Sequence, residues 1–378
     1  MTARKKNTFI DLFAGAGGLS LGLEQAGFQV CFANEIVPTF ANTYKANRNL
    51  QEGQFYIGDI NELNKHLDDY KQYISNATLV CGGPPCQGFS MANRQRIIDD
   101  PRNQLYKAYL TFLQYVRPAF FIMENVKGMA NKILEIKQNF YEYLGDEYLF
   151  DYEILKAQDY GVPQNRERLV LIGNRLGIKP SDIFAEIHKH KRQSFVLRDA
   201  LFGLPHLSPK TDKGRGDIEC ENSGFTQREF LYPQTDFYHF INGDKQLHIL
   251  YNHKNRYNNK RDLEIYQRLP QGANSLHESI ADIMPYKSRN DIFKDKYFKL
   301  AEDQICKTIT SHMKFDCNMY IHPWEARGLS PREAARIQTF PDDYIFTGAQ
   351  NQWYAQVGNA VPVKLAKAIG DGIMYFLR

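Results

Sequence analysis

Cys86 is the residue of this sequence best placed to act as a nucleophile. Pro84 and Pro85 precede it; they fix the backbone φ angle and remove two N–H donors, so the loop is stiff. The apolar run 78–81 predicts a buried parallel strand that ends just before this loop. In open α/β sheets, ligands bind beyond the carboxyl ends of the strands. A nucleophilic thiol and a small buried apolar side chain, the usual fate of a free cysteine, both fit this segment.

A glycine-rich loop follows the first predicted strand, residues 8–13, and leads into a helix expected over about 19–26. Its glycines let a ligand approach the backbone closely, and the helix start offers free N–H groups. Ser20 stands where a dinucleotide-binding loop carries its third glycine, so a pyrophosphate fits poorly.

Acidic residues end the next two predicted strands, 29–33 and 55–57. Glu35 can accept hydrogen bonds from both ribose hydroxyls of a nucleoside, and Asp59 with Ile60 can meet an adenine edge and face. Any one of these acids alone could be a solvated loop carboxylate. Together, at successive strand ends, they favour a nucleoside cofactor, and S-adenosylmethionine suits the phosphate-poor loop best.

Two further groups of polar residues stand beside predicted strands. Glu124 ends the apolar strand 119–123, where it could cap a turn or donate a proton to a substrate in the cleft of Cys86. Arg166 and Arg168 precede the strand 169–173 and, two residues apart, would share one face of a strand. They could bind an anion or hold a carboxylate, or belong to an exposed salt-bridge cluster.

The alternation of strands with helices, including one over about 105–116, predicts a parallel sheet covered on both faces. The regular pattern stops from about 193 to 311, where turn residues increase. Helical signals return at Ser330, Pro331 and Glu333, which fit an N-cap, N1 and N3, and over about 363–377. We expect a catalytic and cofactor-binding domain over 1–192, a smaller recognition domain over 193–349, and a C-terminal helical segment, 350–378, returning to the first.

The composition is that of an ordinary soluble globular protein, and 378 residues predict two domains. Net charge is +4, from 47 basic and 43 acidic residues, which permits a polyanionic partner without requiring one. Cysteines at 31, 81, 86, 220, 306 and 317 show neither disulfide nor zinc spacing. Without a signal peptide or a membrane-spanning run, the expected location is the cytoplasm.

Taken in chain order, the motifs resemble those of the cytosine-5 DNA methyltransferases over nearly the whole sequence. The segments that carry the resemblance are Asp11–Gly18, Glu35, Asp59–Ile60, Pro84–Gln87, Arg102–Leu105, Glu124–Val126, Gln164–Arg168, Arg332–Pro341 and Gln356–Pro362. One departure is Val37, where many members carry Asp, and it weakens a local contact at most because Glu35 remains.

The resemblance implies an α/β fold, with a Rossmann-like S-adenosylmethionine-dependent methyltransferase domain and a smaller, irregular target-recognition domain. It implies methyl transfer to C5 of a flipped-out cytosine in a short duplex DNA sequence, through a covalent Cys86–C6 adduct. Catalytic roles would fall to Cys86, Glu124, Arg166 and Arg168. Cofactor contacts would come from Phe13, Ala14, Gly15, Gly17, Gly18, Leu19, Glu35, Ile36, Asp59, Ile60, Pro84, Asn359 and Ala360, and DNA contacts from Gln87, Ser90, Arg102, Thr308 and Ile309.

Specificity is expected between about 193 and 318, the variable region of the family. Within it, the segment 245–268 holds six Lys or Arg and two acids, interleaved with tyrosines, a composition that suits phosphate contacts. Each of these side chains could equally belong to a solvated helix face. The compactness resembles prokaryotic or phage enzymes that accompany a restriction endonuclease, acting as monomers near the nucleoid and without a metal.

Three other functions fit parts of the sequence. A catalytically silent DNA-binding relative should have lost Cys86, Glu124 or the arginine pair, and all are present. An RNA-directed relative would use the same chemistry, but its known members have a different tripeptide after the nucleophile region and a shorter recognition segment. A nicotinamide-dependent oxidoreductase would share the sheet but would leave Cys86 idle.

Overall fold

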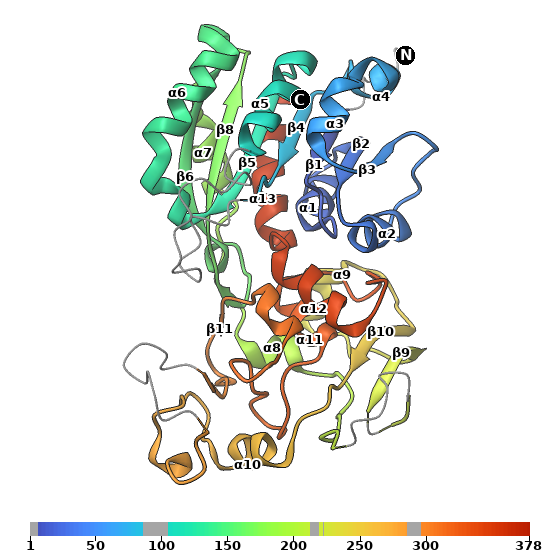
Figure 1. The fold of residues 1–378 in the computed structure, drawn as a ribbon, viewed down its shortest axis with the longest axis vertical. Helices are drawn as coiled ribbons and strands as arrows, with labels where there is room; N and C mark the ends of the chain where they lie inside the picture. Colours follow the sequence, from blue (N-terminus) through green and yellow to red (C-terminus); the bar gives the residue numbers. More distant parts are fainter. Residues whose placement is uncertain (1–6, 86–104, 212–218, 222, 286–295) are drawn as a thin grey trace. The chain divides into compact units, whose positions relative to one another are not determined.

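The computed structural model describes residues 7–85, 105–211, 219–221, 223–285 and 296–378. Two compact units divide the chain (Figure 1). The first is built from Met1–Tyr160, Arg166–Gln193 and Val361–Arg378, and the second from Gly161–Asn165 and Ser194–Ala360. The C-terminal segment 350–378 is therefore shared, because its first helix lies in the second unit and its last helix in the first.

The first unit is built on one seven-stranded sheet in the order β3-β2-β1-β4-β5-β8-β6. Its strands are β1 (Thr8–Leu12), β2 (Gln29–Glu35), β3 (Phe55–Ile57), β4 (Leu79–Gly82), β5 (Phe120–Val126), β6 (Leu149–Lys156) and β8 (Glu167–Asn174). The five strands from β3 to β5 are parallel, whereas β8 runs antiparallel to both β5 and β6. The expectation of a parallel sheet is thus wrong for β8: the chain returns to this strand from the edge strand β6.

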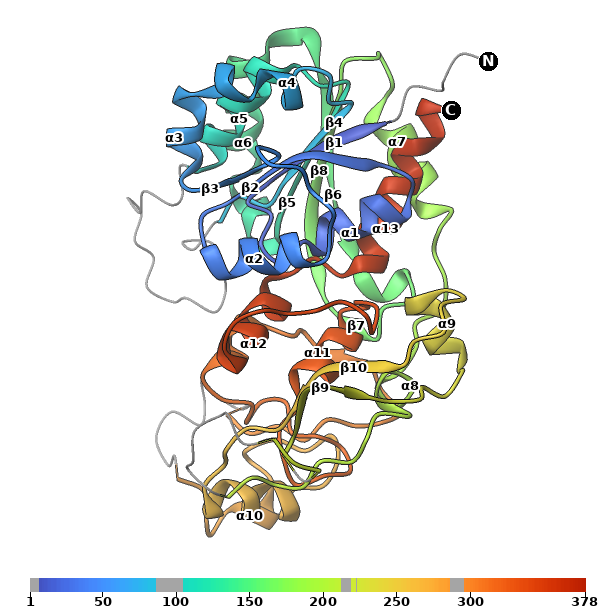
Figure 2. The same ribbon diagram turned by 90° about the vertical axis from the view of Figure 1, so that its right-hand side faces the viewer.

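Helices cover both faces of this sheet, as Figure 2 shows. On one face α1 (Gly18–Gln25) packs against α13 (Val363–Met374), which packs against α7 (Pro180–His188). On the other, α5 (Leu105–Val116) packs against α3 (Ile60–Lys65) and α6 (Ile133–Leu144). Two shorter helices, α2 (Pro38–Ala46) and α4 (Lys71–Ile74), complete the unit. None of the helices in the described ranges is long and apolar enough to cross a membrane.

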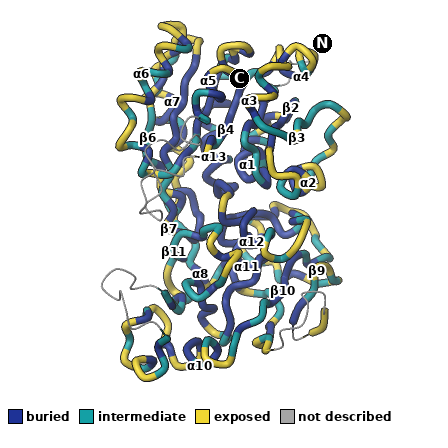
Figure 3. The backbone as a smooth tube through the Cα atoms, in the orientation of Figure 1, coloured by how far each residue is buried: buried dark blue, intermediate teal, exposed yellow. Residues whose placement is uncertain are grey.

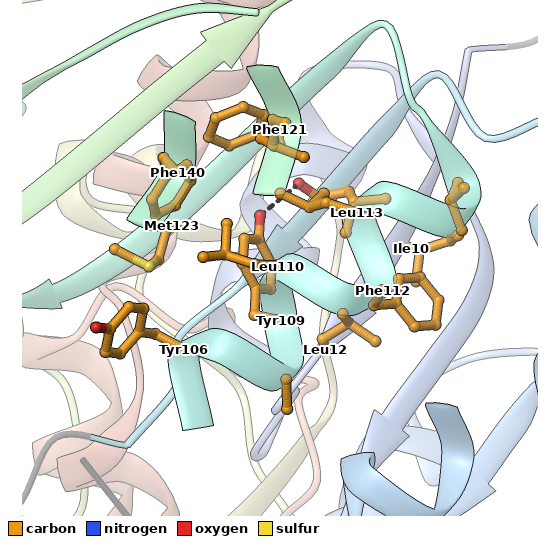
Figure 4. Packing of buried hydrophobic residues seen from close by; sticks show 14 of the residues in the cluster. Ile10, Leu12, Tyr106, Tyr109, Leu110, Phe112, Leu113, Phe121, Met123 and Phe140 are labelled. Atoms are coloured by element: carbon orange, nitrogen blue, oxygen red, sulfur yellow. Dashed lines mark hydrogen bonds between the residues drawn. The ribbon is translucent and has the colours of Figure 1, made fainter. Parts of the chain in front are cut away.

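The main core of the first unit lies between the sheet and helix α5 (Figure 4). Leu110 and Phe112 of the helix pack among strand residues such as Leu12 and Met123, all fully buried. Tyr109 donates its buried hydroxyl to the Ile122 carbonyl at 2.8 Å, with the Val80 carbonyl at 3.2 Å. The central strands are buried, whereas the edge strands β3 and β6 are partly exposed and exposed residues also collect on outer helices such as α6 (Figure 3). Helix α5 therefore fixes both β4, which leads to the predicted nucleophile loop, and β5, which carries Glu124.

The second unit has little regular sheet. Strands β9 (Gly224–Glu229) and β10 (Ile249–Lys254) form an antiparallel pair, and β7 (Gln164–Asn165) pairs in parallel with β11 (Cys306–Lys307). Its helices are α8 (Leu197–Leu201), α9 (Asp236–Asn242), α10 (Lys260–Arg268), α11 (Pro331–Ile337) and α12 (Gln350–Asn359). Small apolar clusters fill it, one of them beneath α10.

Buried ion pairs add to the organisation of the second unit around α11. The predicted capping box is confirmed: Ser330 caps the helix, and the Glu333 carboxylate accepts a hydrogen bond from the Ser330 N–H at 2.7 Å. The same carboxylate accepts two hydrogen bonds from the buried Arg327, at 2.7 and 2.8 Å. Arg336 forms a second two-pronged pair with Asp342, both bonds at 2.8 Å. This helix is therefore anchored by charge as well as by packing.

Candidate active site

The end of strand β4 and the end of strand β5 meet at one edge of the first unit. Gly83 follows β4, and a Cβ atom added there would stand 3.1 Å from a Glu124 carboxylate oxygen. The buried Asn125 donates its amide to the Pro84 carbonyl at 2.8 Å. Asn125 of β5 therefore ties down the start of the loop that leads to Cys86, and Glu124 lies beside it. Four predicted site residues of that region, Cys86, Gln87, Ser90 and Arg102, lie outside the described residues.

Glu124 and Arg168 form an ion pair across neighbouring antiparallel strands. In the register of β5 and β8, Glu124 lies opposite Val170, so Arg168 is its diagonal neighbour. The Arg168 Nε lies 2.7 Å from a Glu124 oxygen, with both side chains only about one-eighth exposed at 12% and 13%. Burial lowers the pKa of the Arg168 guanidinium, and the Glu124 carboxylate opposes that shift. Arg166, two residues earlier, is also buried. The pair holds the carboxylate in a fixed orientation beside Gly83.

The glycine loop after β1 is shaped by left-handed backbone conformations. Phe13, Gly15 and Gly17 have φ angles of 57°, 56° and 82°. The Glu35 carboxylate accepts the Gly15 N–H at 2.7 Å and the Val37 N–H at 2.8 Å. Burial raises the pKa of this carboxyl, while hydrogen bonds from backbone N–H groups oppose the rise. Glu35 therefore ties the loop to the end of β2.

A buried polar chain that the sequence interpretation missed lies beneath this loop. Ser20 donates its hydroxyl to the Asp11 carboxylate and lies 2.6 Å from the Tyr44 hydroxyl. On the other side, the Cys81 thiol of β4 donates to the same carboxylate at 3.6 Å. Burial raises the pKa of Asp11 to about 7, partly offset by the Ser20 hydrogen bond. The hydroxyl at position 20, read from the sequence as a missing glycine, thus links the first turn of α1 to β1.

The third strand end differs in detail from the expectation. Asp59 caps helix α3 by accepting the Asn61 N–H at 2.7 Å, and it is half-buried. Ile60 is 3% exposed and belongs to the core, so its side chain offers no free face for a ligand. The apolar side chains exposed at this edge are Ile36, at 57%, and Ile57, at 40%.

The remaining predicted contact residues fall into two groups. In the first unit, Ala14 is half-buried, and Gly18, Leu19 and Pro84 are buried. In the second unit, Thr308 donates its hydroxyl to the Asn165 carbonyl, while Ile309 is fully buried with its N–H on the Gln164 side chain at 2.8 Å. At the end of α12, Asn359 is exposed and Ala360 buried.

Fold and site together define a Rossmann-like methyltransferase: a glycine loop with a ribose-type carboxylate on one side, and an acid fixed beside a nucleophile loop on the other. Comparison with known proteins gives the family. The sequence model of the C-5 cytosine-specific DNA methylase family matches residues 7–374. The chain therefore belongs to that family and is a DNA cytosine-5-methyltransferase. The predicted family resemblance is confirmed.

Relatives cover nearly the whole chain. The type II methyltransferase M1.HphI of Haemophilus parahaemolyticus is 33% identical over 97% of this chain and 86% of its own length. M.XorII of Xanthomonas oryzae is 31% identical over 98% of this chain and 85% of its own. Among solved structures, one described as a DNA modification methyltransferase encoded in an E. coli prophage superimposes with a TM-score of 0.76, at 28% identity over 98% of this chain and 99% of that one. The Dnmt2 methyltransferase of S. pombe, 16% identical over 99% of this chain and 100% of its own with a TM-score of 0.57, shares the fold.

Proposed function

We propose that this methyltransferase takes its methyl group from S-adenosylmethionine and adds it to C5 of a cytosine turned out of a short, specific duplex DNA sequence. The Glu124–Arg168 pair carries the proposal. It holds an acid beside Gly83, at the start of the segment that leads to Cys86. Relatives of this chain include type II methyltransferases, which supports duplex DNA as the substrate.

The cofactor assignment is supported by the residues around the glycine loop. Glu35 stands at the end of β2, where its carboxylate could exchange a backbone partner for ribose hydroxyls. The exposed Ile36 beside it offers an apolar surface for an adenine ring. Asp59 could meet the adenine edge, and we reassign the adenine face from Ile60 to Ile36 because Ile60 is buried. When bound, S-adenosylmethionine supplies an electrophilic methyl group. Because this cofactor carries no pyrophosphate, it does not need the third glycine of a dinucleotide-binding loop.

The chain's own residues would make the target carbon reactive. The thiolate of Cys86 attacks C6 and forms an S–C6 bond, while the π electron pair of the C5=C6 double bond is displaced and makes C5 enamine-like and nucleophilic. Glu124 holds or protonates N3 and contacts the exocyclic amine, which favours the attack and selects cytosine over thymine. After methylation, loss of the C5 proton and elimination of Cys86 restore the aromatic ring.

Arg168 would keep Glu124 oriented, and both arginines, Arg166 and Arg168, would help bind the extruded nucleotide. Extrusion is needed because C6 is shielded inside a stacked duplex, and it costs a few kcal/mol. DNA contacts are proposed for Gln87, Ser90, Arg102 and Thr308. Ile309, being buried, would support Thr308 from behind.

We further propose that the protein acts as a monomer and protects the target sites of a cognate restriction endonuclease. The type II relatives support the proposed role beside a restriction endonuclease. Asn359 and Ala360 lie within the family motif Gln356–Pro362, and we propose them as cofactor contacts.

The test is transfer of labelled methyl groups from S-adenosylmethionine to duplex DNA, followed by bisulfite sequencing of DNA from cells that express the protein. We expect label on DNA and protected cytosines at one short motif. Label on tRNA and none on any duplex DNA would overturn the substrate assignment.

Substitution of the nucleophile tests the covalent mechanism. Cys86→Ser should abolish turnover while affinity for target duplex stays within a few-fold of wild type, because a hydroxyl is a far weaker nucleophile than a thiolate. Turnover at near-normal rates in this variant would remove Cys86 from the mechanism.

A further inference from the structure

A short exposed turn follows strand β11 in the second unit. After Thr308 and Ile309 the chain enters a 3₁₀ helix, Ser311–Lys314, and ends the turn at Phe315. Lys314 and Phe315 both face solvent, and the Phe315 side chain is 64% exposed. Single exposed aromatic rings are common on protein surfaces, so a binding role for Phe315 depends on what surrounds the ring.

The backbone of this turn is held from three sides. Arg256 donates one guanidinium N–H to the Met313 carbonyl at 2.8 Å and another to the Phe315 carbonyl at 2.7 Å. Tyr320 donates its hydroxyl to the Thr308 carbonyl at 2.7 Å. Gly358 of α12 packs so closely that a Cβ there would stand 2.2 Å from the Thr310 carbonyl carbon. The turn is therefore preorganised, which lowers the entropy cost of binding through its tip.

The tip combines a cation with an aromatic face. The Lys314 ammonium lies 4.7 Å from the centroid of the Phe315 ring, and the His312 ring lies 5.5 Å from it. The acid at the tip, Asp316, lies 3.4 Å from His312. Within the described ranges Lys314 makes no ion pair, so its charge is available to a phosphate.

Four of the six basic residues of the segment 245–268, whose composition suits phosphate contacts, have carboxylate or carbonyl partners within the protein. Lys245 pairs with Asp343 at 2.6 Å, the buried Lys254 with Glu219 at 3.3 Å, and Arg268 with Glu264 and Asp282. Arg256 holds the turn itself. Lys260 and Arg261 of the same segment are exposed at the start of α10, so the Lys314 tip adds to the cations available for DNA.

We propose that Phe315 contacts a base and Lys314 a phosphate of the target duplex, so that this turn contributes to sequence discrimination, with Arg256 as its positioning residue. The turn begins next to the proposed catalytic segment, because Thr308 donates to the carbonyl of Asn165, the residue before Arg166. The inference rests on the proposed function for its substrate.

Phe315→Ala, measured by steady-state methylation of a target duplex, tests the base contact. Loss of one aromatic–base contact should raise KM for the target duplex about 5- to 100-fold, while affinity for S-adenosylmethionine stays unchanged. Phe315→Tyr keeps the ring and should restore KM to near wild type. Phe202→Ala, which removes another ring exposed to a similar degree (55%) in the same unit, is the matched control and should leave KM unchanged.

Lys314→Gln tests the phosphate contact by its salt dependence. The logarithm of DNA affinity should fall less steeply with the logarithm of salt concentration, by about 0.9 in slope, whereas Phe315→Ala should keep the wild-type slope. Arg256→Met should mimic the Phe315→Ala effect on KM, and Arg256→Lys should recover only part of it, because one ammonium replaces a two-pronged guanidinium.

The failure of this inference is distinct from failure of the proposed function. If the wild-type protein methylates a duplex motif but Phe315→Ala retains wild-type KM and the same bisulfite motif, the assignment of the turn is wrong. If the wild-type protein methylates tRNA and no duplex DNA, the proposed substrate and this inference fall together.

Discussion

At the residue scale, Arg168 is the partner that orients Glu124 among the residues that the structure describes. Its carboxylate is held by Arg168 at 2.7 Å, in a setting that is seven-eighths buried, where a charge-assisted hydrogen bond is strong. The residues flanking it act on the neighbouring loop, since Asn125 fixes Pro84. Glu124, Asn125 and Arg168 thus form one small assembly rather than separate contacts.

Glu124→Gln should lower kcat about 10²- to 10⁴-fold, because the amide cannot protonate N3 and interacts more weakly with the charged Arg168. Affinity for target duplex should change little. Asp151→Asn is the matched control, since it breaks a largely exposed pair with Lys137 on the edge strand, and its kcat should equal that of wild type. A Glu124→Gln enzyme within three-fold of wild-type kcat would contradict the proposed acid role.

Residue identities could be predicted from the sequence where a motif names them, but side-chain surroundings could not. The position of Glu124 at a strand end follows from its apolar run, whereas its pairing with Arg168 depends on the register of β8 against β5. Ile60 and Ile309 stand at motif positions yet are buried. Each directly follows a half-buried residue, Asp59 or Thr308, and its own side chain turns into the core. Arg256 belongs to the basic segment whose composition suits phosphate contacts, and composition cannot reveal that its guanidinium binds the backbone carbonyls of residues 313 and 315.

At the scale of elements, buried strands and amphipathic helices were predictable and edge elements were not. The predicted strand 55–57 and helix 105–116 coincide with β3 and α5. Strand β6 was missed because it lies at the sheet edge and alternates irregularly between exposed and buried residues. The apolar sequence of β8 would suit either strand direction. Its antiparallel direction follows from the chain returning into the sheet from the edge strand β6.

The anchoring of α11 gives a second prediction. Asp342→Asn should lower the free energy of unfolding by about 3–5 kcal/mol, because it leaves the fully buried Arg336 guanidinium without its compensating charge. The adjacent Asp343→Asn is a near-ideal control. It breaks an exposed pair with Lys245, and should cost about 1 kcal/mol or less. Urea unfolding of both variants measures the difference, and equal costs would show that Arg336 is not held by its charge.

At the scale of the whole molecule, the two units should respond to acid in opposite directions. Burial lowers the pKa of His253 to about 4 and that of His322 to about 3, so the unfolded chain takes up their protons first and the second unit loses stability as pH falls below 6.5. In the first unit, burial raises the pKa of Asp11 to about 7. The folded state therefore takes up that proton before the unfolded chain does, and its stability rises as pH falls from 7 towards 4.

Hydrogen exchange read separately in each unit, at pH 7.5 and 5.5 and corrected for intrinsic rates, measures this divergence. Protection should fall in the second unit on acidification and hold or rise in the first. Asp11→Asn should remove the gain in the first unit and leave the second unit's loss intact. Parallel losses in both units of the wild-type protein would count against the buried carboxyl as the source.

The path of the chain between the units bears on how such enzymes can exchange specificity. Gln164 and Asn165 open the family motif Gln164–Arg168 yet belong to the second unit. There they pair with β11, and the Gln164 side chain bonds both Ile309 and Gln338. A hybrid enzyme that grafts residues 194–360 from another member would put a foreign strand against this native dipeptide. Grafts should therefore succeed when the donor region can bind a glutamine at position 164. The two residues 164 and 165 would then decide which recognition regions this catalytic unit can accept.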